Sequence, residues 1–356
     1  MSGAFQSERS ATKPFIFHGN AREYFGIWIV NVLLTIVTLG IYSAWAKVRR
    51  NRYFYGNAEL DGARFTYLAT PIQILIGRII VVVALVVFNL IATFAPALGA
   101  VLLIVLLFVF PELVRRGLRF NARTTAYRNV RFDFAGNYGG AFIATIAGPL
   151  LAAFTLGLAA PLASKWTQNY ILSNLTFGGR SFSHSGKTGQ YYGAFWLPFF
   201  LFIGGIALIV VIGIAAAPLF EALENAPDEA AALLVLLPLL PIYFLLLFIF
   251  GGISLIYAAG VRNVAFNATT LDNRHQLKSS IGRWQYVWVM VSNFVVTVLT
   301  LGLMRPWAAV RHARFLAGGT SMNVQGSLAT YSDQLRDAQS SVGAEYMDIE
   351  GVEIGL

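Results

Sequence analysis

The sequence predicts an all-α polytopic membrane protein, and three observations support that fold class. Of its 356 residues, 57% are hydrophobic and only 12% are charged, whereas about a quarter of the residues in soluble domains are charged. Several apolar runs reach or approach the ~20 residues that a helix needs to cross a bilayer. A segment ending in Thr-Leu-Gly occurs three times, at residues 38–40, 155–157 and 300–302, which indicates an internal repeat.

The composition also limits the kinds of binding site and catalysis that the protein can have. The chain has no cysteine, which excludes disulfides, thiolate catalysis and cysteine metal sites. Its four histidines are far apart in the sequence and have no acidic cluster nearby, so we expect neither a metal site nor a cofactor. The sequence contains no P-loop and no recognisable nucleophile–base pair. We therefore predict that the protein is not an enzyme.

The net charge of +9 also bears on the partners of the protein. Its lysines and arginines lie beside the apolar segments, where they are typical of membrane-flanking charge that faces anionic lipid. We expect membrane lipids, and no nucleic acid, as partners. The sequence leaves the oligomeric state open.

The repeated element is a broken helical segment with copies at about 24–46, 139–163 and 285–308. The first and third copies share an Asn, two Thr, a Leu and a Gly at equivalent positions of 31–40 and 293–302. After these they also share a Trp and two Arg. In the second copy, Leu162 replaces the Trp and Asn169 replaces the second Arg. We expect Gly40 and Gly302 to interrupt the helix, so that each segment is either re-entrant or spans the membrane with a break.

Two transmembrane helical hairpins separate the three copies. The first covers about 72–118, with Pro96 and Gly99 at its tip, and the second covers about 192–261 with an acidic tip at 218–231. Both hairpins end in Phe-Asn-Ala followed by a Thr pair. The predicted membrane domain therefore runs over 14–330 as segment, hairpin, segment, hairpin, segment.

Short strand-like pieces lie between the membrane segments, at 15–17, 64–67 and 130–134. Their patterns are typical of short strands and they end at turn residues, so we predict short β pieces at the cytoplasmic face. The polar arm at 1–13 and the acidic tail at 331–356 are expected to be disordered.

The number of membrane crossings stays open between four and seven. Seven full crossings would split the loop lysines and arginines between the two sides, against the positive-inside bias. If each repeated segment enters and leaves on one face, only the two hairpins cross and the loop charge falls on one side. The 16 residues from Tyr24 to Leu39 would make a helix of about 24 Å, shorter than the ~30 Å hydrocarbon core.

A polar stripe follows one helix face in the first and third copies, because its members are spaced at i, i+4 and i+7. The stripe residues are Asn31, Thr35, Thr38, Asn293, Thr297 and Thr300. One interpretation is a path or a small-solute site. The other is hydrogen bonding between helices, which small polar residues supply in lipid.

Two pairs of arginines follow the stripes, and these are Arg49 with Arg52 and Arg311 with Arg314. Guanidinium groups suit phosphate, so these four residues are candidates for binding lipid headgroups or another anion. A further basic cluster lies at 115–131. The alternative is that all of this charge only sets the membrane topology.

The first segment and the turn after it resemble the DUF898 family of bacterial inner-membrane proteins, also called the YjgN type. The resemblance rests on Thr38-Leu39-Gly40-Ile41-Tyr42, Trp45-Ala46, Arg49, Arg52-Tyr53, Asn57, Asp61-Gly62 and Arg64-Phe65, and it covers about 14–330. It implies a multi-pass protein of the bacterial inner membrane. It brings no activity, substrate or catalytic residues.

Two functions remain open for this integral inner-membrane protein. The first is a channel or transporter for a small solute or ion, because transporters are often built from repeats with broken helices. The alternative is a non-transporting membrane scaffold or anionic-lipid-interacting protein, which the dense basic charge favours.

Overall fold

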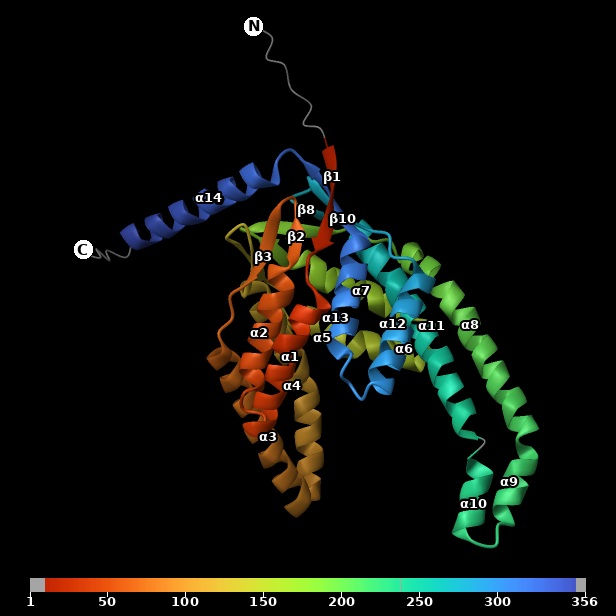
Figure 1. The fold of residues 1–356 in the computed structure, drawn as a ribbon. Coiled ribbons are helices and arrows are strands. Elements are labelled where there is room, and N and C mark those ends of the chain that lie inside the picture. Colours follow the sequence, from red (N-terminus) through yellow and green to blue (C-terminus); the bar gives the residue numbers. More distant parts are fainter. Residues whose placement is uncertain (1–9, 238, 350–356) are drawn as a thin grey trace.

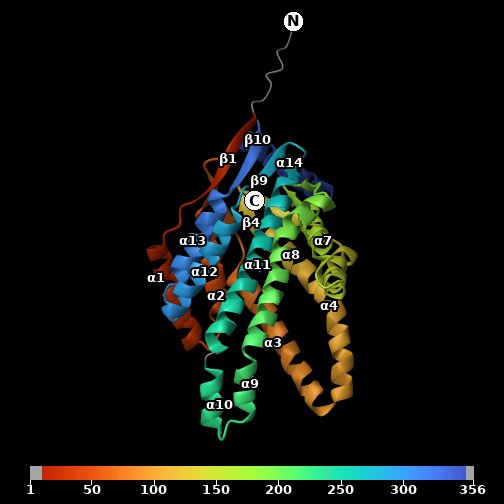
Figure 2. The same ribbon diagram turned by 90° about the vertical axis from the view of Figure 1, so that its right-hand side faces the viewer.

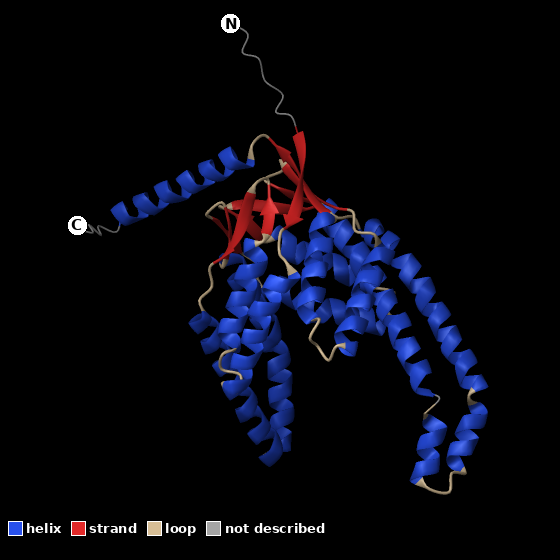
Figure 3. Cartoon of the chain, in the orientation of Figure 1, coloured by secondary structure: helices blue, strands red, loops and turns tan. Residues whose placement is uncertain are grey.

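The computed structural model describes residues 10–237 and 239–349. It consists of a β-barrel at one end and helices that extend from that barrel (Figures 1 and 3). Two long helical hairpins reach furthest from the barrel, and shorter helices lie between them (Figures 1 and 2).

Ten antiparallel strands close the barrel in the order β1-β10-β9-β8-β7-β6-β5-β4-β3-β2. The strands are β1 (Ser10–Phe17), β2 (Ala58–Leu60), β3 (Ala63–Tyr67), β4 (Thr125–Tyr127), β5 (Val130–Phe134), β6 (Leu175–Phe177), β7 (Arg180–His184), β8 (Thr269–Leu271), β9 (His275–Ser279) and β10 (Thr320–Gln325). β1 pairs with both β10 and β2, so the two ends of the membrane domain meet in one sheet.

Tight turns connect the four local hairpins of the barrel. The β2–β3 turn places Asp61 and Gly62 at φ +48° and +74°, and the β4–β5 turn places Arg128 and Asn129 at φ +48° and +64°. Two consecutive residues with positive φ form the turn that matches the twist of a two-residue hairpin. These sequence-local turns position strands that find their other partners far along the chain.

The prediction of an all-α protein is wrong, because the short β pieces form this closed barrel. Four of the ten strands are only three residues long, and these four are too short for an alternating pattern to be recognised. Each hairpin also pairs with strands from other hairpins, as β3 does with β4 across the first long helical hairpin. Pairing of this kind is set by tertiary structure rather than by local sequence.

Among the described residues, four helices are long and apolar enough to cross a membrane. They are α3 (Pro71–Phe94), α4 (Pro96–Arg123), α8 (Thr188–Ala215) and α11 (Leu239–Asn267). α3 and α4 form the first hairpin. The second hairpin, α8 with α11, is extended at its tip by the short helices α9 (Ala217–Glu224) and α10 (Glu229–Leu236). These four helices are the ones that cross in the four-crossing arrangement.

Each repeated segment is a pair of shorter helices that reverses at Thr-Leu-Gly. The pairs are α1 (Ala21–Val37) with α2 (Ser43–Gly56), α5 (Tyr138–Phe142), η1 (Ile143–Ala147) and α6 (Gly148–Phe154) with α7 (Ala160–Ser173), and α12 (Arg283–Leu299) with α13 (Arg305–Gly318). The leucine and glycine of every break have positive φ, near +50° and +90°. Leu39, Leu156 and Leu301 at the tips are 94%, 89% and 94% exposed.

The helix contacts close a ring beside the barrel. α1 packs on α2 and α13, α2 on α3, α4 on α5, α7 on α8, and α11 on α12. The three repeated segments therefore pack against the hairpins. As in the barrel, the first and third copies meet, which joins the two ends of the chain.

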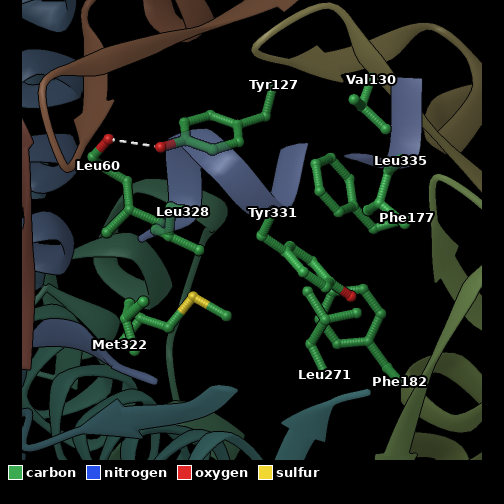
Figure 4. Close-up of a cluster of buried hydrophobic side chains, with 11 residues drawn as sticks. Leu60, Tyr127, Val130, Phe177, Phe182, Leu271, Met322, Leu328, Tyr331 and Leu335 are labelled. Atoms are coloured by element: carbon green, nitrogen blue, oxygen red, sulfur yellow. Dashed lines mark hydrogen bonds between the residues drawn. The ribbon is translucent and has the colours of Figure 1, made fainter. Parts of the chain in front are cut away.

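The barrel interior is filled with apolar side chains and is capped by α14 (Leu328–Ile349) (Figure 4). Leu328, Tyr331 and Leu335 of this helix pack among Tyr127, Phe177 and other inward-facing residues. The structure thus corrects the ends of the chain: residues 10–13 belong to β1 and not to a loose arm, and residues 331–349 are helical. Residues 1–9 and 350–356 lie outside the described residues.

Candidate functional site

The threonines of the polar stripe bond to the breaks in their own segments. The Thr38 hydroxyl donates to the Leu34 carbonyl at 2.7 Å and accepts from the Tyr42 amide at 2.9 Å. Thr155 and Thr300 make the same two bonds in their copies. Each hydroxyl therefore links the last turn of one helix to the residue that precedes the next helix, through local side-chain bonds to the backbone. Thr35 and Thr297 donate to the carbonyls of Asn31 and Asn293.

The structure brings the stripe asparagines together with the first arginine of each pair. Arg311 donates through Nη1 to Asn293 Oδ1 at 2.9 Å and to Ser292 Oγ at 2.6 Å. Asn293 Nδ2 in turn donates to the Ala308 carbonyl at 3.1 Å. In the first copy, Arg49 Nη1 reaches Asn31 Oδ1 at the longer distance of 3.3 Å. These contacts tie the two helices of a segment to each other.

The second copy replaces this polar tie with close packing. Gly148 stands at the asparagine position, and a Cβ there would lie 3.2 Å from the Ala163 Cβ. Ala163 matches Ala308, whose carbonyl accepts from Asn293 in the third copy. The polar stripe is therefore one of two ways to hold the same helix pair, which favours the helix-contact interpretation over a solute path.

The Asn293→Ala substitution is expected to lower the free energy of unfolding by about 1–3 kcal/mol, because it leaves a buried hydrogen-bond network incomplete. Asn31→Ala should cost less, since Arg49 is more exposed and its bond is longer. Unfolding midpoints of the two purified variants in detergent check this order. Equal midpoints for both variants would contradict it.

The other two candidate arginines do not join these ties. Arg314 Nη2 donates to the Gly19 carbonyl at 3.0 Å, which links the third copy to the loop before the first. Arg52 is exposed and has no ion pair or hydrogen bond within the described residues. The four candidates therefore do not form one site.

A different set of arginines lines a pocket of about 460 Å³ where α3, α4 and β5 meet. We call it the arginine pocket, and its lining residues are Leu68, Gln73, Arg116, Arg119, Phe120, Arg123, Thr124 and Arg131. Arg116, Arg119 and Arg123 recur at three- and four-residue spacing, so they share one face of α4. Arg131 arrives from β5, which pairs with β4 directly after α4.

The four arginines differ in how many of their guanidinium N–H groups bond to other residues of the protein. Arg123 makes a bidentate ion pair with Asp133 at 2.8 and 3.1 Å, and this guanidinium holds the pKa of Asp133 below its usual range. Arg119 uses Nε to bond the Phe134 carbonyl at 3.0 Å. Arg116 uses Nε to bond Glu112 at 2.7 Å. The Arg131 side chain is exposed and makes no ion pair or hydrogen bond within the described part of the chain.

The pocket lies where the apolar length of the first hairpin ends. The apolar run of α4 stops at Pro111 and Glu112, and the pocket arginines follow in the next three turns. α3 begins at Pro71, beside the pocket residue Gln73. Charged side chains at this boundary lie at the depth of lipid headgroups.

Two other hollows differ in character. A pocket of about 340 Å³ between α8, α11 and the second break is lined mainly by aromatic and aliphatic residues. One of about 550 Å³ in the second copy is lined by Asn137, Trp166, Asn169 and Asn174 among others. In residues 10–237 and 239–349, no three His, Asp or Glu side chains gather as a metal ion would require.

These features define a class: a multi-pass membrane protein in which broken helical segments and two apolar hairpins are joined through a closed, capped β-barrel. The chain matches the model described as a bacterial protein of unknown function (DUF898) over residues 12–349. It therefore belongs to the DUF898 family, which confirms the expectation from the sequence motifs.

Similar proteins include the "Inner membrane protein YjgN" of Salmonella typhimurium, which is 29% identical over 92% of each chain. The proteins of that name from Escherichia coli O157:H7 and K12 are 38% identical over 146 residues, which span 40% of this chain and 36% of theirs. No solved structure matches the chain. The protein is an inner-membrane protein, as the sequence predicts, and four of its described helices are able to span the membrane.

Proposed function

We propose that this inner-membrane protein is a non-transporting protein that holds anionic phospholipids at the barrel side of the membrane. The proposal rests on a group of exposed lysines and arginines around the barrel. These residues have no ion pair among the described residues: Arg22, Lys47, Arg50, Arg52, Arg64, Arg131, Lys187, Arg274 and Lys278. Each basic group near an anionic bilayer surface contributes ~1 kcal/mol of attraction.

The charge distribution along the hairpins supports the same proposal. The tip of the second hairpin carries Glu221, Glu224, Asp228 and Glu229 and no basic residue, and it lies at the end away from the barrel (Figure 1). By the positive-inside bias, the barrel faces the cytosol, the side on which anionic lipid attracts basic segments.

The channel or transporter hypothesis has less support in the geometry. The stripe asparagines and threonines bond within their own helix pairs, and apolar side chains fill the barrel. Neither feature supplies a polar path along the barrel axis. The hypothesis stays open for a route between the helices.

The proposal is tested with the full-length protein in nanodiscs that contain phosphatidylcholine and phosphatidylglycerol. We expect the protein to retain phosphatidylglycerol above its bulk fraction, measured by mass spectrometry of the lipid carried out of the disc. The enrichment should fall as salt rises, because exposed charges are screened. Equal retention of both lipids would overturn the proposal. In a parallel assay with sealed proteoliposomes, a saturable solute flux that is lost in Asn293→Ala would favour a transporter.

A further inference from the structure

We infer that the arginine pocket binds the phosphate group of an anionic phospholipid, whose acyl chains lie along α3 and α4. This inference rests on the proposed function and names the site and the ligand class within it. It uses a cluster that is separate from Arg49, Arg52, Arg311 and Arg314, the arginine pairs that follow the repeated segments.

The pocket offers guanidinium donors that the protein itself leaves unused. Arg119 and Arg116 each commit only Nε, to a carbonyl and to Glu112, so their terminal nitrogens remain available. The Arg131 guanidinium has no ion pair or hydrogen bond within residues 10–237 and 239–349. Phosphate oxygens accept two parallel bonds from such forks, and these charge-assisted bonds are short and strong.

The charge of the pocket matches an anion. Four arginines and no carboxylate line it. Two carboxylates lie outside the lining: Glu112 is shared between Arg116 and Arg115, and Asp133 pairs with Arg123. This leaves an excess of at least two positive charges. A headgroup that carries one or two negative charges would neutralise this excess.

The surroundings of the pocket favour a lipid over a soluble anion. α3 and α4 touch at their tip, where a Cβ on Gly99 would lie 2.7 Å from the Ala92 Cα, and they diverge toward the barrel (Figure 2). The lining includes Leu68 and Phe120, and Ile72 at the start of α3 is 62% exposed. A ligand with a phosphate at the pocket and apolar chains below it covers both kinds of surface.

The closing experiment titrates the full-length protein, in phosphatidylcholine nanodiscs, with phosphatidylglycerol and follows bound lipid by native mass spectrometry. Arg131→Gln should weaken binding about tenfold, and Arg119→Gln with Arg131→Gln about a hundredfold, since each removes a charge-assisted phosphate contact. The matched control is Arg305→Gln. Arg305 lies outside the pocket at the start of α13, is exposed, and makes no side-chain hydrogen bond or ion pair among the described residues.

Other results would contradict the pocket, the proposed function or the lipid as ligand. Retention of phosphatidylglycerol that neither arginine variant weakens would overturn the pocket and leave the proposed function in place. No retention in any variant, the wild type included, would overturn both. Inorganic phosphate is added as a second probe. Binding of inorganic phosphate with the same arginine dependence and comparable affinity would assign the pocket to a free anion. If the double variant fails to fold, Arg131→Gln alone decides, because its side chain touches no described partner.

Discussion

Phe134→Ala is expected to lower the free energy of unfolding by about 3–5 kcal/mol, the usual cost of truncating a buried aromatic residue. Phe134 is 2% exposed at the end of β5, and its ring meets Tyr170 edge-on at 5.5 Å. It packs with Ala122, Ala141 and Ala144, so it joins the barrel to α4, α5 and α7. Its loss leaves a cavity at the junction of these elements.

Thermal unfolding of the purified protein in detergent measures this effect. Phe94→Ala is the matched control, because Phe94 is 83% exposed at the tip of the first hairpin and its truncation leaves no cavity. An equal loss of stability in both variants would show that the ring of Phe134 is not packed at the barrel junction.

Leu335→Ala is expected to lower the free energy of unfolding by about 2–5 kcal/mol and to speed protease cleavage within α14. Leu335 is 5% exposed and belongs to the apolar cluster that fills the barrel. A Cβ on Gly178 would lie 2.9 Å from the Leu335 Cβ, so the β6–β7 turn and α14 are in close contact. Truncation removes one of three anchors that hold the cap.

The neighbouring substitution Gln334→Ala is the control for the cap, because Gln334 is exposed on the other side of the same helix turn. Unfolding midpoints and the cleavage rate of the tail are measured together. A tail that is unstructured in solution would give identical values for Leu335→Ala, Gln334→Ala and the wild type.

The composition of the capping helix suggested disorder, whereas the spacing of its apolar residues indicates a helix. The acidic residues of the tail are typical of disorder. Leu328, Tyr331 and Leu335, however, lie at i, i+3 and i+7, which places them on one helix face. That face is buried only because a barrel mouth exists to receive it, and the sequence did not reveal the barrel.

The candidate site could likewise be predicted from the sequence only in part. The spacing of Arg116, Arg119 and Arg123 on one face of α4 could be recognised from the sequence alone. Arg131 joins them only through the pairing of β4 with β5. Conversely, the residues singled out from the repeats, Asn293 and Arg311, lie together as helix ties, because hydrogen-bonding side chains in a membrane segment find partners on the adjacent helix.

The sequence by itself determined the membrane class, the three Thr-Leu-Gly breaks and the two apolar hairpins, since each depends on local composition and on turns within a few residues. Only the tertiary structure decided the barrel, the cap and the arginine pocket. Their strands are three to eight residues long, and the Thr12 hydroxyl bonds to Asn323, 311 positions away. Contacts between segments so short and so distant are specified by how the whole chain packs, which no local pattern records.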